Sequence, residues 1–198
     1  TKYLEKVDEA KKDKNQQSLK TIQKQIKQIE NLVNEFSDFA RMPKPLIKNN
    51  NLYEVIEENI NLLNKIDSNI KIKLINHLTK DSYAKFDYEQ FNRLFFNLIK
   101  NSIESIQEKA EKDNKIDKNI DIEIRERRDY IVINILDTGT GFKNKVTKDL
   151  IKPYFTTKQK GTGLGLSIVD KIISDHNGSI NFLNQKNGAK IQIIIPNK

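Results

Sequence analysis

The chain has 198 residues, of which 36% are hydrophobic and 31% charged, with no cysteine and a formal net charge of +8. This length fits one domain of ordinary size with an appendage, and the lack of cysteine excludes disulfides and thiolate metal sites. No apolar run approaches the roughly 20 residues of a membrane span, so we expect no membrane contact. Lysines are scattered among Glu, Asp and Asn without an Arg-rich stripe, which indicates a basic surface and no nucleic-acid binding.

The N-terminal part is predicted to hold one long helix, over residues 18–42. Its apolar residues alternate at spacings of three and four, which is an a/d seam over three heptads: Leu19, Ile22, Ile26, Ile29, Val33, Phe36 and Ala40. So narrow a seam favours a coiled-coil or bundle partner over ordinary core packing. Residues 8–17 are predicted as a polar loop, and residues 1–7 as the stub of an earlier helix.

Two prolines, Pro43 and Pro45, end the long helix, because proline lacks the amide and restricts the residue before it. They divide the chain into residues 1–45, interpreted as a partial dimerisation segment, and residues 46–198, which have the pattern of an α/β domain. Its predicted helices are 51–66, 88–110 and 165–175. Its predicted strands are 70–78, 119–126, 130–136, 179–183 and 189–195, with a hairpin at Arg128-Asp129.

The helix predicted over 88–110 has one narrow polar stripe at spacings of three and four: Gln90, Arg93, Asn97, Asn101, Glu104 and Glu108. A solvated helix face would give the same pattern. The apolar residues around the stripe, and uncharged asparagines at its middle, favour a site instead. An amide oxygen is a hard ligand that suits Mg²⁺.

The stretch D-T-G-T-G follows the strand predicted over 130–136 directly. The Asp137 carboxylate could accept a hydrogen bond from an exocyclic amine and so select adenine over guanine. Gly139 and Gly141 would let the backbone approach the base. The alternative is an Asp that caps its own backbone in a turn.

The stretch K-G-T-G-L-G-L, residues 160–166, leads into an amphipathic helix. Backbone amides at a helix N-terminus bind phosphate together with the helix dipole. The stretch is not a Walker A loop, since no G-K-[ST] closes it, and its glycines do not follow a first βα strand as in a Rossmann fingerprint. Between the two glycine motifs lie six lysines, at positions 143, 145, 148, 152, 158 and 160.

In their order, N-L-I-K-N, D-T-G-T-G, P-Y-F-T-T-K and G-T-G-L-G-L resemble the N, G1, F and G2 boxes of sensor histidine kinases, members of the gyrase, heat-shock-chaperone, histidine-kinase and MutL ATPase superfamily. The segment E-F-S-D-F-A-R-M-P-K-P resembles the end of the second dimerisation helix of nitrogen-regulation (NtrY-type) kinases. The resemblance, from about residue 18 onward, implies a two-layer α/β sandwich, the Bergerat ATP-binding fold, preceded by a long helix. It also implies ATP and Mg²⁺ as ligands.

The same resemblance implies that Asn101 coordinates Mg²⁺ and that Asn97 supports the metal–phosphate site. Asp137 would hold the adenine amine, and Gly139 and Gly141 would line the base pocket. Residues 142–160 would form a mobile lid whose lysines face the phosphates. The other implied nucleotide contacts are Glu104, Lys158, Lys160, Gly161, Thr162, Gly163, Leu164 and Gly165.

Two departures from the family pattern stand out. Arg93 occupies the position at which many superfamily members have a general-base glutamate, which argues against plain ATP hydrolysis. His77 and His176 both lack the H-E-x-x-N-P context of the phosphoacceptor, so we expect both to be structural and no certain catalytic residue to be present. The phosphoacceptor helix is expected to be missing, with the chain starting at its C-terminal end.

The leading hypothesis is the catalytic part of a two-component sensor histidine kinase, cytoplasmic or the cytoplasmic part of a membrane-tethered parent. In the intact protein, a homodimer, it would phosphorylate a histidine for relay to a response-regulator aspartate. An alternative is a non-catalytic, nucleotide-gated dimerisation module of the same fold. A related serine kinase that acts on an anti-sigma-factor antagonist is a third hypothesis, but it leaves the heptad helix unexplained.

Overall fold

The computed structural model describes the backbone of residues 2–78, 83–113, 115–142, 147–156, 158 and 161–197. The chain divides into two compact units, Thr1–Met42 and Pro43–Lys198. The division falls beside the first proline, where helical hydrogen bonding stops for lack of an amide. It lies at residue 42, whereas the sequence placed the boundary at residue 45.

The first unit contains a single helix, α1 (Lys2–Ala40), without a break. The predicted loop over residues 8–17 and the separate stub over residues 1–7 are therefore wrong. Residues 8–17 contain no Gly or Pro, and Lys, Glu, Gln and Ala are good helix formers, so polarity alone does not interrupt the helix. Apart from Ala40, the seam side chains are 47–60% exposed. Among the described residues, no helix is both long and apolar enough to cross a membrane.

The second unit is built on a five-stranded sheet in the order β2-β4-β5-β7-β6. The strands are β2 (Lys71–His77), β4 (Asn119–Arg127), β5 (Tyr130–Asp137), β6 (Ser179–Gln185) and β7 (Gly188–Pro196). Strands β2 and β4 are parallel, and the other neighbours are antiparallel. A separate two-stranded antiparallel sheet pairs β1 (Lys48–Asn51) with β3 (Tyr83–Phe86).

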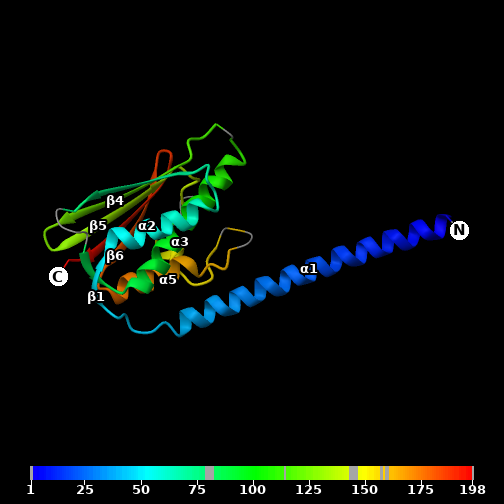
Figure 1. Cartoon of the computed structure of the whole chain (residues 1–198), viewed down its shortest axis with the longest axis horizontal. Coiled ribbons are helices and arrows are strands. Elements are labelled where there is room, and N and C mark those ends of the chain that lie inside the picture. The colour runs from blue at the N-terminus through cyan, green and yellow to red at the C-terminus, as the bar shows by residue number, and fades with distance from the viewer. Residues whose placement is uncertain are drawn as a thin grey trace. The chain divides into compact units, whose positions relative to one another are not determined.

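Three helices lie together over one face of the five-stranded sheet: α2 (Leu52–Asn64), α3 (Tyr88–Ala110) and α5 (Gly165–Asp175) (Figure 1). The strands alternate buried and more exposed residues beneath them, as a sheet covered on one face requires. The most deeply buried side chains of the two layers include Leu52, Ile56, Phe91, Leu94, Phe95, Leu98, Ile99, Ile120 and Ile122. This arrangement confirms the predicted α/β fold.

The structure contains three short elements that the sequence did not predict: β1, β3 and the one-turn helix α4 (Thr147–Leu150). The β1 sequence K-N-N-N has no apolar alternation, and a four-residue strand or helix is too short to show a period. The long elements agree with prediction, since α3 and α5 have the expected bounds and β4, β5, β6 and β7 extend one or two residues further.

The start of α3 is fixed by Asp87 and His176. One carboxylate oxygen of Asp87 accepts the Gln90 amide at 3.0 Å and the other accepts the Leu46 amide at 2.6 Å. The Asp87 amide donates to Nε2 of buried His176 at 3.0 Å, while Nδ1 of the same ring lies 2.7 Å from the Ile172 carbonyl. Both ring nitrogens of His176 thus have hydrogen-bond partners within the protein. His176 is therefore a packing residue.

Candidate nucleotide site

The polar stripe of α3 faces the N-terminus of α5. Asn97 and Asn101 are half-buried in the middle of the stripe, and the side-chain Nδ2 of Asn97 donates to the Arg93 carbonyl at 2.9 Å. A Cβ on Gly165, the first residue of α5, would lie 3.2 Å from Oδ1 of Asn97 and 4.0 Å from Nδ2 of Asn101. The absence of a side chain at Gly165 thus lets the end of α5 approach the asparagine pair closely.

Asp137, the last residue of β5, is only 8% exposed. Its Oδ1 accepts the Gly139 amide at 2.9 Å, and its Oδ2 accepts the hydroxyl of Ser102, on α3, at 3.2 Å. Burial raises the pKa of the Asp137 carboxyl, although these hydrogen bonds and the nearby Lys109 ammonium act in the opposite direction. One oxygen therefore caps the turn, as the plain alternative expects. The contact of the other oxygen with α3 brings the carboxylate beside the asparagine stripe.

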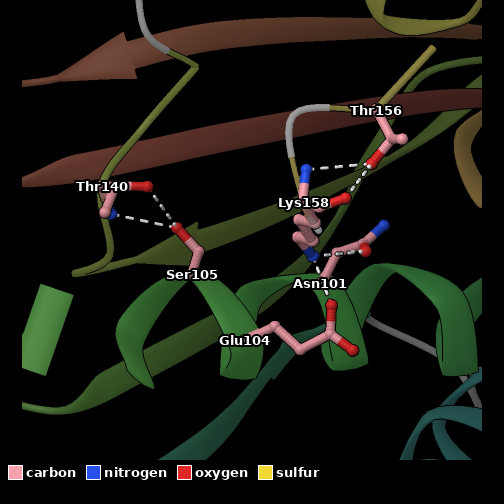
Figure 2. A network of polar contacts seen from close by, with 6 residues as sticks. All are labelled: Asn101, Glu104, Ser105, Thr140, Thr156 and Lys158. Carbon is pink, nitrogen blue, oxygen red and sulfur yellow. Dashed lines mark hydrogen bonds and ion pairs between the residues drawn. The ribbon is translucent and has the colours of Figure 1, made fainter. Parts of the chain in front are cut away.

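The turn after Asp137 rests directly on α3. A Cβ on Gly139 would lie 2.3 Å from Oγ of Ser105, which shows how closely backbone and helix approach. The Thr140 amide donates to this Oγ at 3.0 Å, and the two hydroxyls lie 3.2 Å apart (Figure 2). Gly141 has a φ of +70°, a conformation that glycine adopts without cost. The glycines were expected to line a base pocket, and this tight packing is what the structure demonstrates for Gly139.

The loop before α5 folds back on itself through its glycines. Gly163 has a φ of +74°, and a Cβ there would lie 2.5 Å from the Tyr154 carbonyl carbon. A Cβ on Gly161 would lie 2.6 Å from Oγ1 of Thr156. The same Thr156 hydroxyl accepts the Lys158 amide at 3.1 Å. The F-type and G2-type segments are thus packed against each other, with no room for side chains between them.

Lys158 links this loop to the polar stripe. Its Nζ donates to Oδ1 of Asn101 at 3.1 Å and forms an ion pair with Glu104 (Figure 2). Lys152 is exposed and pairs with Asp149 at 2.6 Å. The structure does not test the predictions for the other lid lysines. Lys143, Lys145 and Lys160 lie outside the described residues, as does the side chain of Lys148.

Among the described residues, no side chain caps the N-terminus of α5. Its N-cap residue, the fully buried Leu164, uses its carbonyl for the Ile168 amide at 2.9 Å and the Ser167 hydroxyl at 2.8 Å. Its amide lies 3.4 Å from Oγ1 of Thr162. A helix start without a side-chain acceptor leaves its first amides for an anion.

Sequence reasoning missed the hydroxyls that connect the three motifs, which belong to Ser102, Ser105, Thr140 and Thr156. Ser105 follows Asn101 by four positions and so lies on the same helix face. This spacing could have identified Ser105, but only charged and amide residues were counted in the stripe. In the described part of the chain, no group of three or more His, Asp and Glu side chains forms a metal site. His77 is half-exposed on β2, with Nε2 3.4 Å from Glu123.

Comparisons with known proteins show which family and which fold this chain resembles. Residues 86–198 match the family model of histidine kinase-, DNA gyrase B-, and HSP90-like ATPases. The chain is 34% identical over 160 residues to nitrogen regulation protein NtrY of Azorhizobium caulinodans, an alignment that covers 81% of this chain and 20% of that protein. This chain thus spans only a small part of that relative.

Two solved structures share the fold. The nucleotide-free catalytic domain of the histidine kinase ThkA superposes with a TM-score of 0.66 at 27% identity, over 76% of this chain and 95% of that one. ThkA in complex with the response regulator TrrA superposes with a TM-score of 0.72 at 23% identity, over 89% of this chain and 49% of that one. At the second identity, the likeness concerns the fold alone.

Proposed function

The chain belongs to the family of histidine kinase-, DNA gyrase B- and HSP90-like ATPases, and we propose on this basis that it is the ATP-binding catalytic part of a sensor histidine kinase. One observation carries the proposal. Helix α3 carries the asparagine stripe and contacts both other segments. The turn after Asp137 binds it through Ser105, and the loop before α5 binds it through Lys158. Three segments far apart in sequence thus meet at one helix, and each has chemistry that suits a nucleotide.

In this proposal the two ends of the site bind the two ends of ATP. Asp137 accepts the exocyclic amine of adenine, with its carboxylate held by Gly139 and Ser102. The amides of residues 161–165 and the uncapped start of α5 bind the phosphates, with Thr162, Leu164 and Lys160 contributing as the family resemblance implies. Lys158 supplies a positive charge on the same side.

Magnesium fits the residues of the stripe. Asn101 presents an amide oxygen and Glu104 a carboxylate, and both already bind a cation, the Lys158 ammonium. Oxygen ligands of this kind suit Mg²⁺, which commonly takes one or two protein ligands and completes its shell with water and phosphate oxygens. When bound, the ion would neutralise charge on the phosphates, and Asn97 would support Asn101 from the preceding turn.

The phosphoryl acceptor is proposed to be a histidine outside this chain, because neither histidine here suits the role. His176 has both ring nitrogens occupied, and His77 lies on a strand beside Glu123. Positioning and charge neutralisation carry most of such a transfer. A homodimeric parent, a response-regulator receiver domain as the next acceptor, and a cytoplasmic location complete the proposal.

Calorimetric titration of the purified chain with Mg·ADP, and separately with Mg·GDP, is the experiment for this proposal. We expect ADP to bind and GDP to bind far more weakly, because the guanine position that faces Asp137 carries an oxygen. Incubation with γ-labelled ATP should leave no phosphate on the chain. Equal affinity for both nucleotides, or an acid-labile phosphate on His77 or His176, would contradict the proposal.

A second candidate function is a nucleotide-gated module without catalysis, and the surroundings of the two histidines favour it. Both ring nitrogens of His176 are occupied and His77, on β2, is paired with Glu123, so neither suits a phosphoacceptor within this chain. Supplying the chain with a separate helical hairpin that carries the parent's acceptor histidine distinguishes the two functions. Phosphate transfer to that hairpin supports the kinase, whereas nucleotide binding without transfer supports the module.

A further inference from the structure

The ligand proposed for magnesium is already occupied by the protein's own cation. Nζ of Lys158 lies 3.1 Å from Oδ1 of Asn101 and forms an ion pair with Glu104 (Figure 2). The side chains of Lys158 and Glu104 are 33% and 37% exposed, so the pair is half-shielded from water. A single ammonium thus bridges the two oxygen groups at the centre of the stripe.

The loop holds Lys158 in this place through its backbone. The Lys158 amide donates to Oγ1 of Thr156 at 3.1 Å, and the Lys158 carbonyl accepts the Gly161 amide at 3.3 Å. Gly161 lies against the same Thr156 hydroxyl, at a distance where a Cβ would not fit. The turn that carries Lys158 is therefore held by contacts within the protein, and the side chain reaches α3 from a defined position.

An ammonium and a divalent cation cannot share this amide oxygen. Two positive charges that use the same acceptor would lie within a few ångströms of each other, and the repulsion between like charges at that range is large in a half-buried site. Magnesium also needs direct contact with its oxygen ligands at roughly 2.1 Å, closer than the ammonium sits. One of the two cations has to leave before the other binds.

We propose that Lys158 occupies the magnesium position on Asn101 in the nucleotide-free protein, and that metal and lysine exchange there when nucleotide binds. This inference rests on the proposed function, since it assigns a second role to a residue of that site. The exchange keeps a cation beside Asn101 and Glu104, with +2 in place of +1, and frees the Lys158 ammonium for the phosphates. The lysine of the loop thereby competes with the metal, which lowers the benefit that magnesium brings to nucleotide binding.

The test compares ADP affinity with Mg²⁺ and with EDTA. The quantity of interest is the dissociation constant in EDTA divided by the dissociation constant in Mg²⁺. In Lys158→Met the metal no longer displaces an ammonium, so the ratio should rise about two- to fivefold, the range for a half-exposed ion pair. Lys171→Met is the matched control, because Lys171 pairs with Asp175 at 3.0 Å on α5 with similar exposure. The control should keep the parent ratio.

The outcomes separate this inference from the function on which it rests. If the parent binds no ADP, both fail. If the parent binds ADP and Lys158→Met weakens binding equally with and without Mg²⁺, the lysine is only a phosphate ligand and the exchange is refuted. A second variant examines the contact itself: Glu104→Gln should make the Lys158 amine about twofold or more reactive in amine labelling read by mass spectrometry. Unchanged labelling relative to Lys171 would also refute it.

Discussion

At the scale of single residues, Asp137 is the side chain on which nucleotide selectivity depends. Asp137→Asn replaces an acceptor with an amide that can present a donor to the adenine amine. The loss of one charge-assisted hydrogen bond should weaken Mg·ADP binding by about 1.5–3 kcal/mol, measured by calorimetry. A variant that melts like the parent and binds as tightly would show that Asp137 has no role with adenine.

The same substitution should have the opposite effect on stability. Burial raises the pKa of Asp137 in the folded state, so the folded protein binds its proton more tightly than the unfolded chain does. The stability that this group contributes is therefore present below its unfolded pKa of about 3.9 and is lost as the pH rises through the folded value. Asp137→Asn should raise the melting temperature at pH 7, with the gain vanishing near pH 3. A lower melting temperature at pH 7 would contradict this.

Asn101 should control the response to magnesium. Asn101→Ala removes the proposed metal ligand, so the difference in ADP affinity between Mg²⁺ and EDTA should shrink towards a factor of one. Asn61→Ala, at an exposed position of α2, is the control and should keep the parent difference. The measurement is a pair of titrations for each protein. An unchanged magnesium dependence in Asn101→Ala would place the ligand on another residue.

At the scale of elements, the loop before α5 depends on one glycine more than on its neighbour. Gly163 has a φ of +74°, and its missing Cβ would meet backbone atoms of Tyr154 and Phe155. Gly161 has no such φ, and its nearest neighbour is the Thr156 hydroxyl. Gly163→Ala should therefore cost at least about 1–3 kcal/mol of unfolding free energy in urea, and more than Gly161→Ala. Equal costs would mean that the loop repacks freely.

Helix α1 carries an apolar seam whose residues are exposed in this chain, and such a seam favours pairing with another helix. We expect weak, concentration-dependent self-association in sedimentation experiments. Ile26→Lys places a charge on the seam and should abolish it. Thr21→Lys adds the same charge at an exposed position off the seam and should not. A chain that stays monomeric at millimolar concentration would show that the seam alone does not associate.

At the scale of the whole molecule, the sequence predicts the long elements of the α/β unit well because their apolar pattern repeats over many residues. Helix α3 has ten buried positions at helical spacing, and its bounds follow from the sequence. Strand β1 and helix α4 have four residues each, too few to show a period. The continuity of α1 through its polar start was missed because a charged stretch without Gly or Pro fits a loop and a solvated helix equally well.

The site shows a similar division. The motifs single out Asn101, Asp137 and Gly163, since glycines and paired asparagines stand out in the sequence, and the structure brings their three segments together around α3. The hydroxyls of Ser102, Ser105 and Thr156 were not foreseen, because serine and threonine occur widely and their partners are distant in the chain. Their contacts depend on how the turn after β5 and the loop before α5 meet α3, which only tertiary packing decides.

The most direct measurement is a backbone amide NMR map of the chain titrated with Mg·ADP. We expect saturable shifts that cluster at residues 97–105 on α3, at residues 137–141 after β5 and at residues 161–165 at the start of α5, with little change along α2 or β6. These three segments lie around one helix, so they should respond together with one dissociation constant. Absence of shifts at millimolar Mg·ADP, or shifts centred on the far strands of the sheet, would contradict the nucleotide site.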